Sequence, residues 1–195
     1  MNSGEATGRR EAILDAATHV FVRYGFKKTS MDDLARAAGL SRQGLYIHFS
    51  TKEELFKAAL IHLVAQLRGA AREALGREEL SIAERLLGAF EAMHGVAIQA
   101  LSSEHVDELF ETAEALVGPL IDDAERAFID DVAKALRTSG VATAWKELGL
   151  SAKDLAEHLQ AASHGAKHHV SSAAEYRERM RVAVRIVTHG RARTG

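Results

Sequence analysis

Two adjacent residues, Arg42 and Gln43, carry the side-chain types that recognise DNA bases. An arginine guanidinium pairs with guanine O6 and N7, and a glutamine amide pairs with adenine N6 and N7. Both stand at the start of a short predicted helix over residues 42–48, and Leu45 and Phe49 give that helix an apolar face four residues apart. We therefore expect Arg42 and Gln43 to be exposed and to read base edges.

The residues before this helix predict the elements that must position it. Ser30 and Asp33 have the spacing of a capping box, at the start of a helix whose apolar residues recur at helical spacing. Gly39 ends that helix, Leu40 can fill the turn, and Ser41 can cap the next helix. A helix-turn-helix of this kind places its second helix in the major groove of DNA.

Residues 9–60 also carry several short motifs in a fixed order. They are Tyr24-Gly25-Phe26, Thr29-Ser30-Met31, Ala38-Gly39-Leu40-Ser41, Leu45-Tyr46-Ile47-His48-Phe49 and Lys52-Glu53-Glu54-Leu55-Phe56. Together they resemble the DNA-binding domain of the TetR (tetracycline-repressor-like) family of bacterial transcription regulators. The resemblance implies that the positions of Tyr46, His48 and Lys52 hold DNA phosphates, which set register without reading sequence.

The predicted DNA-binding set combines both lines of reasoning. It consists of Lys28, Thr29, Ser41, Arg42, Gln43, Gly44, Tyr46, His48 and Lys52. For Thr29 and Ser41, a hydroxyl or backbone contact to phosphate stands beside a simple capping role, and a capping or turn role is slightly favoured for Thr29. Gly44 costs about 1 kcal/mol of helix propensity relative to Ala, which indicates either close approach of DNA or tight packing.

The pattern beyond residue 56 predicts an all-α chain of about nine helices. We expect a flexible N-terminal arm over residues 1–8, a three-helix DNA-binding domain over 9–56, and a helical effector-binding and dimerisation domain over 57–195. Separate helices are expected before and after Pro119, and residues 139–150 are expected to form a connection around Trp145. Ser151 with Asp154 and Ser172 with Glu175 predict the starts of the last two helices.

The last predicted helix is more apolar than one buried face requires, because Val182, Val184, Ile186 and Val187 lie close together. In the family resembled, the last two helices form the interface of a homodimer. Two recognition helices held about 34 Å apart would read a palindromic operator. We therefore expect a homodimer that binds double-stranded DNA and, by family default, represses.

The resemblance also implies a small-molecule effector, which would be apolar or amphipathic. The candidate ligand-binding residues are Phe90, Met93, His94, Phe110, Phe128 and Trp145. Such residues at helical spacing are more often ordinary core. His164 and His168 have i, i+4 spacing that could clamp a metal ion, but a polar seam between subunits is favoured, so we expect no metal and no cofactor.

Composition excludes several other classes. The chain has no cysteine, and its net charge is −2, with eight Lys or Arg and seven Asp or Glu in residues 1–56. It contains no long apolar run, no phosphate-binding loop and no nucleophile motif. We expect a soluble cytoplasmic protein that contacts no membrane and is not an enzyme. The rival hypothesis is a helical ligand-binding or scaffold protein that does not act through DNA.

Overall fold

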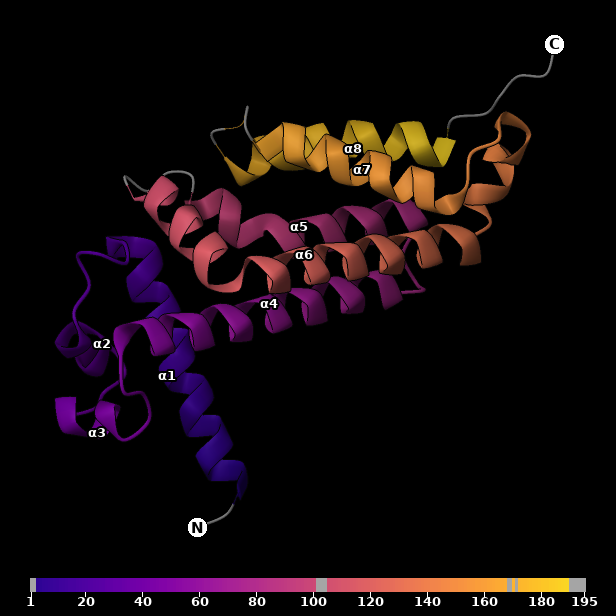
Figure 1. Ribbon diagram of the computed structural model, residues 1–195. Helices are drawn as coiled ribbons and strands as arrows, with labels where there is room; N and C mark the ends of the chain where they lie inside the picture. The colour runs from indigo at the N-terminus through magenta and orange to yellow at the C-terminus, as the bar shows by residue number, and fades with distance from the viewer. Residues whose placement is uncertain (1–2, 101–104, 168–169, 171, 190–195) are drawn as a thin grey trace. The chain divides into compact units, whose positions relative to one another are not determined.

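The computed structural model describes residues 3–100, 105–167, 170 and 172–189. These residues form eight α-helices and one 3₁₀-helix and no strand (Figure 1), so the predicted all-α class is confirmed. Their contacts divide the chain into two compact units. Unit 1 comprises residues 1–66 and 100–122, and unit 2 comprises residues 67–99 and 123–195.

Unit 1 contains α1 (Ser3–Tyr24), α2 (Met31–Ala37), α3 (Arg42–Tyr46) and the first part of α4 (Lys52–Gly76). Its core is formed by apolar residues of all four helices, and it includes Phe21, Leu34, Leu45, Phe49, Leu55 and Phe56. The Phe21 and Phe56 rings meet edge to face with 4.8 Å between their centroids. This packing fixes α1 against α4 and gives α2 and α3 a rigid base.

Two glycines end helices of unit 1 in the left-handed region. Gly39, at φ +66°, follows α2, where a residue with a Cβ would be strained. Gly25, at φ +80°, follows α1, and a Cβ there would lie 3.0 Å from Cβ of His105. Backbone conformation and close packing therefore both favour glycine at position 25.

The N-terminal arm differs from the prediction. α1 begins at Ser3, so residues 3–8 continue the helix instead of forming an irregular arm. Glu5 and Ala6 favour a helix, and the cost of each glycine in this segment is only about 1 kcal/mol.

Unit 1 also extends beyond residue 56, where the sequence placed the domain boundary. Ala59 belongs to its core, as does Leu109 from the start of α6 (Val106–Thr138), and Leu116 packs against that core. The backbone N–H of Lys27 donates to the Glu108 carboxylate at 2.6 Å. The start of α6 is therefore part of the compact unit that carries α2 and α3.

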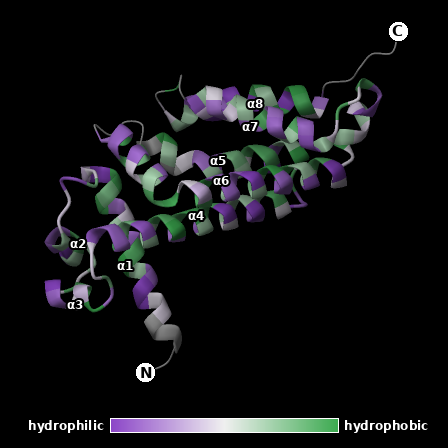
Figure 2. Ribbon diagram, viewed as in Figure 1, coloured by the Kyte–Doolittle hydropathy of each residue, from purple (hydrophilic) through white to green (hydrophobic). Residues whose placement is uncertain are grey.

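Unit 2 contains α5 (Ile82–Ala100) up to residue 99, the second part of α6, the 3₁₀-helix η1 (Val141–Leu148), α7 (Ala152–Lys167) and α8 (Ala173–His189). Within this unit α7 and α8 lie side by side (Figure 1). Apolar and polar residues alternate around these helices (Figure 2), as amphipathic helices require. The core includes Leu86, Phe90, Phe128, Leu136, Leu159, Tyr176 and Met180.

Two predicted features of this region can be compared with the structure. The helices expected on either side of Pro119 meet at a kink within α6, at Val117, where φ is −142° and the backbone is not helical, so the predicted break is present. Proline removes an N–H donor and crowds the preceding turn, which bends a helix without always ending it. The expected connection over residues 139–150 contains η1, which Gly140 and Gly149 bound with positive φ.

The predicted capping box of α7 is present, and one of the two hydrogen bonds of the box predicted for α8 is found. The backbone N–H of Asp154 donates to Ser151 Oγ at 3.2 Å, and the Ser151 N–H donates back to the Asp154 carboxylate at 2.7 Å. At the start of α8, the N–H of Glu175 donates to Ser172 Oγ at 3.2 Å. Within the described ranges, no helix is both long and apolar enough to span a bilayer.

Candidate functional site

One side of the helix α3 is buried in the core of unit 1, and the opposite side is exposed to solvent. Leu45 and Phe49 are fully buried in the core of unit 1, whereas Arg42 and Gln43 are exposed. Ser41 caps the helix, because its Oγ accepts the backbone N–H of Gly44 at 3.0 Å. The regular helix ends at Tyr46, two residues earlier than predicted.

Arg42 is held on two sides. Its Nη1 donates to Oδ2 of Asp32, on α2, at 3.2 Å, and its guanidinium carbon lies 5.6 Å from the centre of the Tyr46 ring. A hydrogen bond with Tyr46, followed by the charge of Asp32, raises the pKa of Arg42 above its already high value. The guanidinium therefore stays charged and keeps further N–H groups for a guanine edge.

Gly44 has a structural explanation. A Cβ at this position would lie 3.2 Å from Ser41 Oγ and 3.8 Å from Leu40 Cβ. The first distance is shorter than ordinary van der Waals contact, so a side chain would press on the cap of α3. Of the two interpretations of this glycine, tight packing is the one with an observed contact.

The candidate phosphate contacts fall into two groups. Lys28 and Tyr46 are exposed, and His48 is partly exposed, so their polar ends are available to DNA. Thr29 and Lys52 instead bind the protein itself. The hydroxyl of Thr29 is buried and donates to the Gly25 carbonyl at 2.6 Å, which is a contact within the turn after α1.

Lys52 connects the start of α4 to the loop between α1 and α2. Its Nζ donates to the carbonyls of Phe26 and Thr29 at 2.8 and 2.9 Å, and it lies 4.3 Å from the centre of the Phe26 ring. Its ammonium is thus occupied with backbone acceptors. The expected phosphate role of Lys52 is replaced by a structural one.

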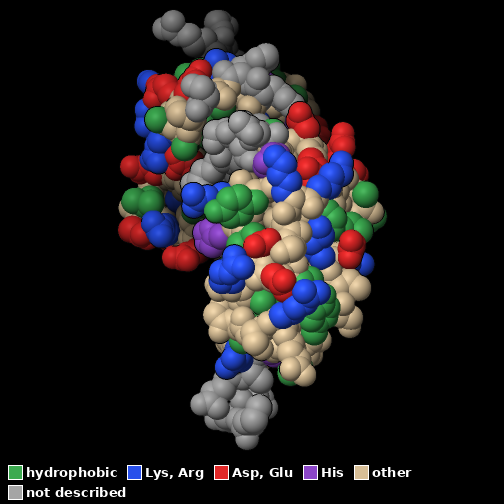
Figure 3. Space-filling model, turned by 90° about the vertical axis from the view of Figure 1, so that its left-hand side faces the viewer, with side chains coloured by type: hydrophobic (Ala, Val, Ile, Leu, Met, Phe, Trp, Pro, Cys, Tyr) green, Lys and Arg blue, Asp and Glu red, His purple; other side chains and the backbone are tan. Residues whose placement is uncertain are grey.

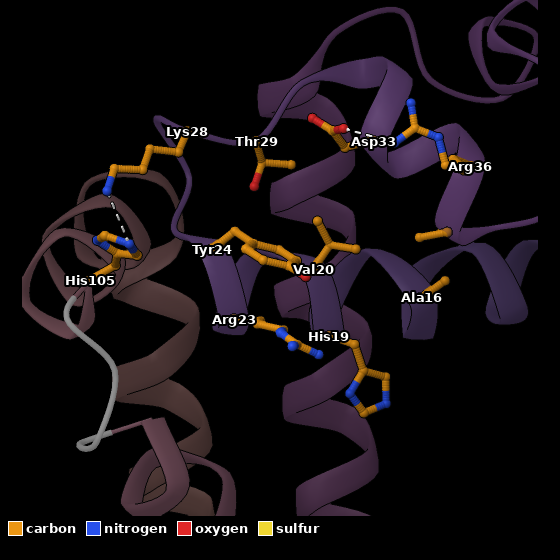
Figure 4. A pocket seen from close by; sticks show the side chains of 11 residues that line it. Ala16, His19, Val20, Arg23, Tyr24, Lys28, Thr29, Asp33, Arg36 and His105 are labelled. Atoms are coloured by element: carbon orange, nitrogen blue, oxygen red, sulfur yellow. Dashed lines mark hydrogen bonds and ion pairs between the residues drawn. The ribbon is translucent and has the colours of Figure 1, made fainter.

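A groove of about 870 Å³ lies on the α1 and α2 side of unit 1 (Figure 4). Its lining includes Arg23, Lys28 and Arg36, and one acid, Asp33. The acid is neutralised locally, because Asp33 accepts from Ser30 and pairs with Arg36 at 3.4 Å. Lys28 Nζ lies 3.5 Å from His105 Nε2. The groove is positively charged beside the helix-turn-helix, which favours phosphate groups.

The charges of the exposed surface are interleaved. On the face drawn in Figure 3, Lys and Arg side chains lie among Asp and Glu side chains and form no single basic patch. The pairs Arg42–Asp32 and Arg36–Asp33 are two instances on α2 and α3. Attraction to DNA therefore depends on individual contacts more than on bulk charge.

Sequence reasoning missed two residues of this surface. Ile47 is 78% exposed, although it is apolar, and an exposed aliphatic side chain on a recognition helix can contact a thymine methyl group. Its position was predictable, since Leu45 and Phe49 point inward and the residue midway between them faces away. Asp32 had no comparable sequence signal, because its contact with Arg42 depends on the turn between α2 and α3.

The ligand candidates are only partly brought together. Phe90, His94 and Phe128 gather in unit 2, with 5.1 Å between the two phenylalanine ring centres and 6.2 Å between those of Phe90 and His94. Met93 packs against the same core, and Trp145 donates from Nε1 to the Val187 carbonyl at 2.9 Å. Phe110 is not part of this cluster, because it belongs to unit 1 and is 48% exposed.

The structure adds a polar cluster beside these aromatic residues. Its members are Glu125, Gln160, His164 and Lys167, together with His94. His164 Nε2 lies 2.6 Å from Glu125 Oε1, and Lys167 Nζ lies 3.4 Å from His94 Nδ1. The described residues contain no group of three or more acids and histidines that could hold a metal ion, and His168 lies outside them.

The geometry of unit 1 defines a class of protein. A capped helix α2, a glycine turn and a short helix α3 with exposed Arg42 and Gln43 form a helix-turn-helix DNA-binding domain. Residues 13–59 match the family model described as bacterial regulatory proteins, tetR family. Residues 13–59 therefore form a DNA-binding domain of the kind found in this family of transcription regulators, as the sequence motifs indicated.

Curated relatives agree over the N-terminal part of the chain. Over 84 residues it is 43% identical to the transcriptional activator FasR of Mycolicibacterium smegmatis and 34% identical to the transcriptional repressor ComR of Escherichia coli. These matches cover 43% of this chain in each case, and 38% and 40% of the two relatives. The chain thus spans less than half the length of these relatives, which regulate in opposite directions.

Solved structures match almost the whole chain. A TetR-family regulator from Mesorhizobium loti shares the fold with a TM-score of 0.66 at 20% identity, covering 97% of this chain and 98% of that one. A TetR-like regulator from Rhodococcus sp. RHA1 matches with a TM-score of 0.60 at 26% identity, over 94% and 97% of the two chains. The C-terminal helices therefore have the family's fold as well.

Proposed function

We propose that this protein is a homodimeric repressor that binds a palindromic operator and is released by a small ligand. The observation that carries the proposal is α3, which is anchored by buried Leu45 and Phe49 and presents Arg42 and Gln43 to solvent. Arg42 and Gln43 are proposed to read bases. Lys28, Tyr46 and His48, with the amide end of α3 at Ser41, are proposed to hold phosphates.

The proposed dimer rests on α8. Val184 and Val187 are buried within unit 2, but Val182 and Ile186, one helical turn apart, are 54% and 55% exposed. An exposed apolar pair on a helix that already has a buried side is typical of a subunit interface. A twofold axis through α7 and α8 would place two copies of α3 in one dimer, as the reading of a palindrome requires.

The proposed ligand response needs two states of different DNA affinity. A ligand that binds unit 2 better in the state that does not fit the operator would shift the population off DNA. Moving this balance from 99:1 to 1:99 takes a preference of about 5.5 kcal/mol. The cluster around Phe90, His94 and Phe128 supports the location, because it combines apolar walls with polar groups.

The decisive experiment is selection of duplexes from a random DNA library by the purified protein at moderate salt, followed by sequencing. Enrichment of one inverted repeat is expected. Gln43→Ala should relax base preference at one or two positions in each half-site, whereas Tyr46→Phe and His48→Ala should weaken all sites alike. An unaltered preferred sequence for Gln43→Ala would refute the base-reading role of Gln43.

The rival function, a helical ligand-binding or scaffold protein, makes the opposite prediction. In that case the triple variant Arg42→Ala, Gln43→Ala, Tyr46→Ala would bind DNA as the wild type does. Selection without enrichment by a folded dimer, repeated with apolar metabolites present, would favour the rival.

A further inference from the structure

The buried polar side chains of unit 2 gather in one place. His94, Gln160 and Ser163 are the buried polar side chains among the described residues of this unit. Ser163 is satisfied, because its hydroxyl lies 2.7 Å from the Tyr176 hydroxyl. His94 and Gln160, which are 7% and 5% exposed, each keep a buried polar atom without a hydrogen-bond partner. Such atoms are rare in native proteins and call for an explanation.

The unpaired atom of His94 is a donor. The ammonium of Lys167 can only donate, so at 3.4 Å its partner Nδ1 must be the lone-pair nitrogen of the ring. Burial, followed by the charge of Lys167, lowers the pKa of His94 to about 3, so the ring is neutral near pH 7. The single ring proton is therefore on Nε2, which is the atom without a partner.

The unpaired atom of Gln160 is an acceptor. Its amide nitrogen donates to Glu125 Oε1 and lies 3.1 Å from His164 Nε2. Turning the amide over would direct Oε1 at the Glu125 carboxylate, so the carboxylate sets the orientation. Oε1 is then left buried without a donor. The two side chains are neighbours, because Gln160 affects the pKa of His94.

This pair of atoms favours a ligand group that both accepts and donates a hydrogen bond. A carboxylate can only accept and would be repelled by Gln160 Oε1, and an ammonium can only donate and would oppose the N–H of His94. A hydroxyl group does both, because it accepts from His94 Nε2 and donates to Gln160 Oε1. The neighbouring Phe90 and Phe128 rings provide an apolar surrounding for the rest of such a molecule.

We propose that His94 Nε2 and Gln160 Oε1 form a recognition site for the hydroxyl group of an uncharged, otherwise apolar ligand, an alcohol or a phenol. The proposal rests on the proposed function in one respect, since it names the chemical class of the effector. It adds Gln160, and through it Glu125 as a positioning residue, to the ligand site. Lys167 has the role of fixing the tautomer of His94.

The test uses phenol and toluene, two probes of similar size that differ by a hydroxyl in place of a methyl group. Thermal unfolding of the full chain is followed with each probe at equal millimolar concentration, because a ligand of the folded state raises Tm. We expect phenol to raise Tm more than toluene in the wild type, and we expect no such difference in His94→Leu. Equal shifts in the wild type, or a difference that survives in His94→Leu, would overturn the proposal.

A second variant tests the same site in case His94→Leu does not fold. Gln160→Met keeps the volume and removes the acceptor, so the difference between phenol and toluene should disappear here as well. If Gln160→Met kept the full difference, the acceptor role of Gln160 would be refuted.

Stability without any probe gives an independent readout. His94→Leu removes an unpaired buried donor and also the Nδ1 acceptor of Lys167, so its Tm should fall no further than that of a variant that loses one satisfied hydrogen bond. The matched control Ser163→Ala breaks such a bond in the same cluster and should lower Tm by about 2–4 °C. A loss of Tm in His94→Leu clearly larger than in the control would mean that the ring N–H is paired in the protein, contrary to the proposal.

Failure of the site and failure of the proposed function are distinguishable. The unfolding measurements need no DNA and decide the hydroxyl site by themselves. Phenol is then added to the protein bound to its selected operator. Preferential binding of phenol without any change in DNA affinity would leave the site intact and refute ligand-controlled release.

Discussion

Asp32 Oδ2 lies 3.2 Å from Arg42 Nη1, so an acid of α2 directly holds a proposed base-reading side chain of α3. Both residues are exposed, and an exposed ion pair contributes little to stability. The pair instead orients the guanidinium of Arg42. An arginine that is already oriented loses less side-chain entropy when it pairs with a guanine. The pair also places a negative charge close to the expected path of the DNA.

Replacing this acid should separate specificity from affinity. Asp32→Asn should relax base preference at the position read by Arg42 by about two- to five-fold, the value of an exposed ion pair. It should also raise affinity for unrelated DNA, because a negative charge is removed. Fluorescence anisotropy with operator and scrambled duplexes measures both. The control Glu53→Gln removes an exposed acid at the start of α4 and should leave base preference unchanged; parallel changes in the two variants would contradict the role of Asp32.

Lys52 should act on stability more than on DNA binding. Lys52→Met keeps the aliphatic stem but removes the bonds to the Phe26 and Thr29 carbonyls, and we expect the free energy of unfolding to fall by about 1–2 kcal/mol. The dependence of DNA affinity on salt should keep its slope. Lys28→Met is the matched control, and there the slope should decrease by about 0.9 with little change in stability. The reverse pattern would place the Lys52 ammonium on a phosphate.

The capping box of α7 should make stability depend on pH in the acid range. Hydrogen bonds from the Ser151 hydroxyl and then its backbone N–H lower the pKa of Asp154 below its ordinary value of 3.8. A carboxyl with a lowered folded-state pKa stabilises the fold above pH 3.8, and this contribution is lost as the pH falls through the folded-state value.

Ser151→Ala removes the hydroxyl from this pair. Its stability deficit in urea unfolding should therefore be present at neutral pH and shrink once Asp154 is protonated in both proteins. Ser139→Ala is a suitable control, because Ser139 Oγ donates to the Leu136 carbonyl and not to an acid. Its deficit should not vary with pH. A constant deficit for Ser151→Ala would disprove the linkage.

The exposed apolar pair on α8 should determine the oligomeric state. Ile186→Arg places a charge in the proposed interface, and burying an unpaired charge is costly, so the dimer should dissociate. Sedimentation equilibrium measures the mass directly, and operator affinity should fall in parallel. Ile186→Leu keeps the patch apolar and should remain dimeric. A wild-type protein that is monomeric at micromolar concentration, or an unaffected Ile186→Arg dimer, would rule out this interface.

Local signals in the sequence were sufficient for most of unit 1. Ser30, Gly39 and Ser41 act within a few residues of themselves, through caps and through a backbone conformation that favours glycine. The helical spacing of Leu45 and Phe49 was enough to place Arg42 and Gln43 on the outside. Such features depend on short-range hydrogen bonds and periodicity, which the order of residues specifies directly.

Short-range reasoning was insufficient where the outcome depends on partners that are distant in the chain. Lys52 has a side chain suited to phosphate, but its ammonium donates to the carbonyls of Phe26 and Thr29, which only the folded chain brings close. Phe110 has the composition of a pocket residue but lies exposed in unit 1.

The sequence by itself determined the all-α class and the helix-turn-helix domain, because these depend on caps, turns and periodicity within about thirty residues. Only the tertiary structure decided which polar groups form hydrogen bonds within the protein and which remain available to DNA or a ligand. It paired Asp32 with Arg42, and it buried His94 against Lys167 across more than seventy residues of chain. Contacts of that separation depend on how helices pack, and no local pattern encodes them.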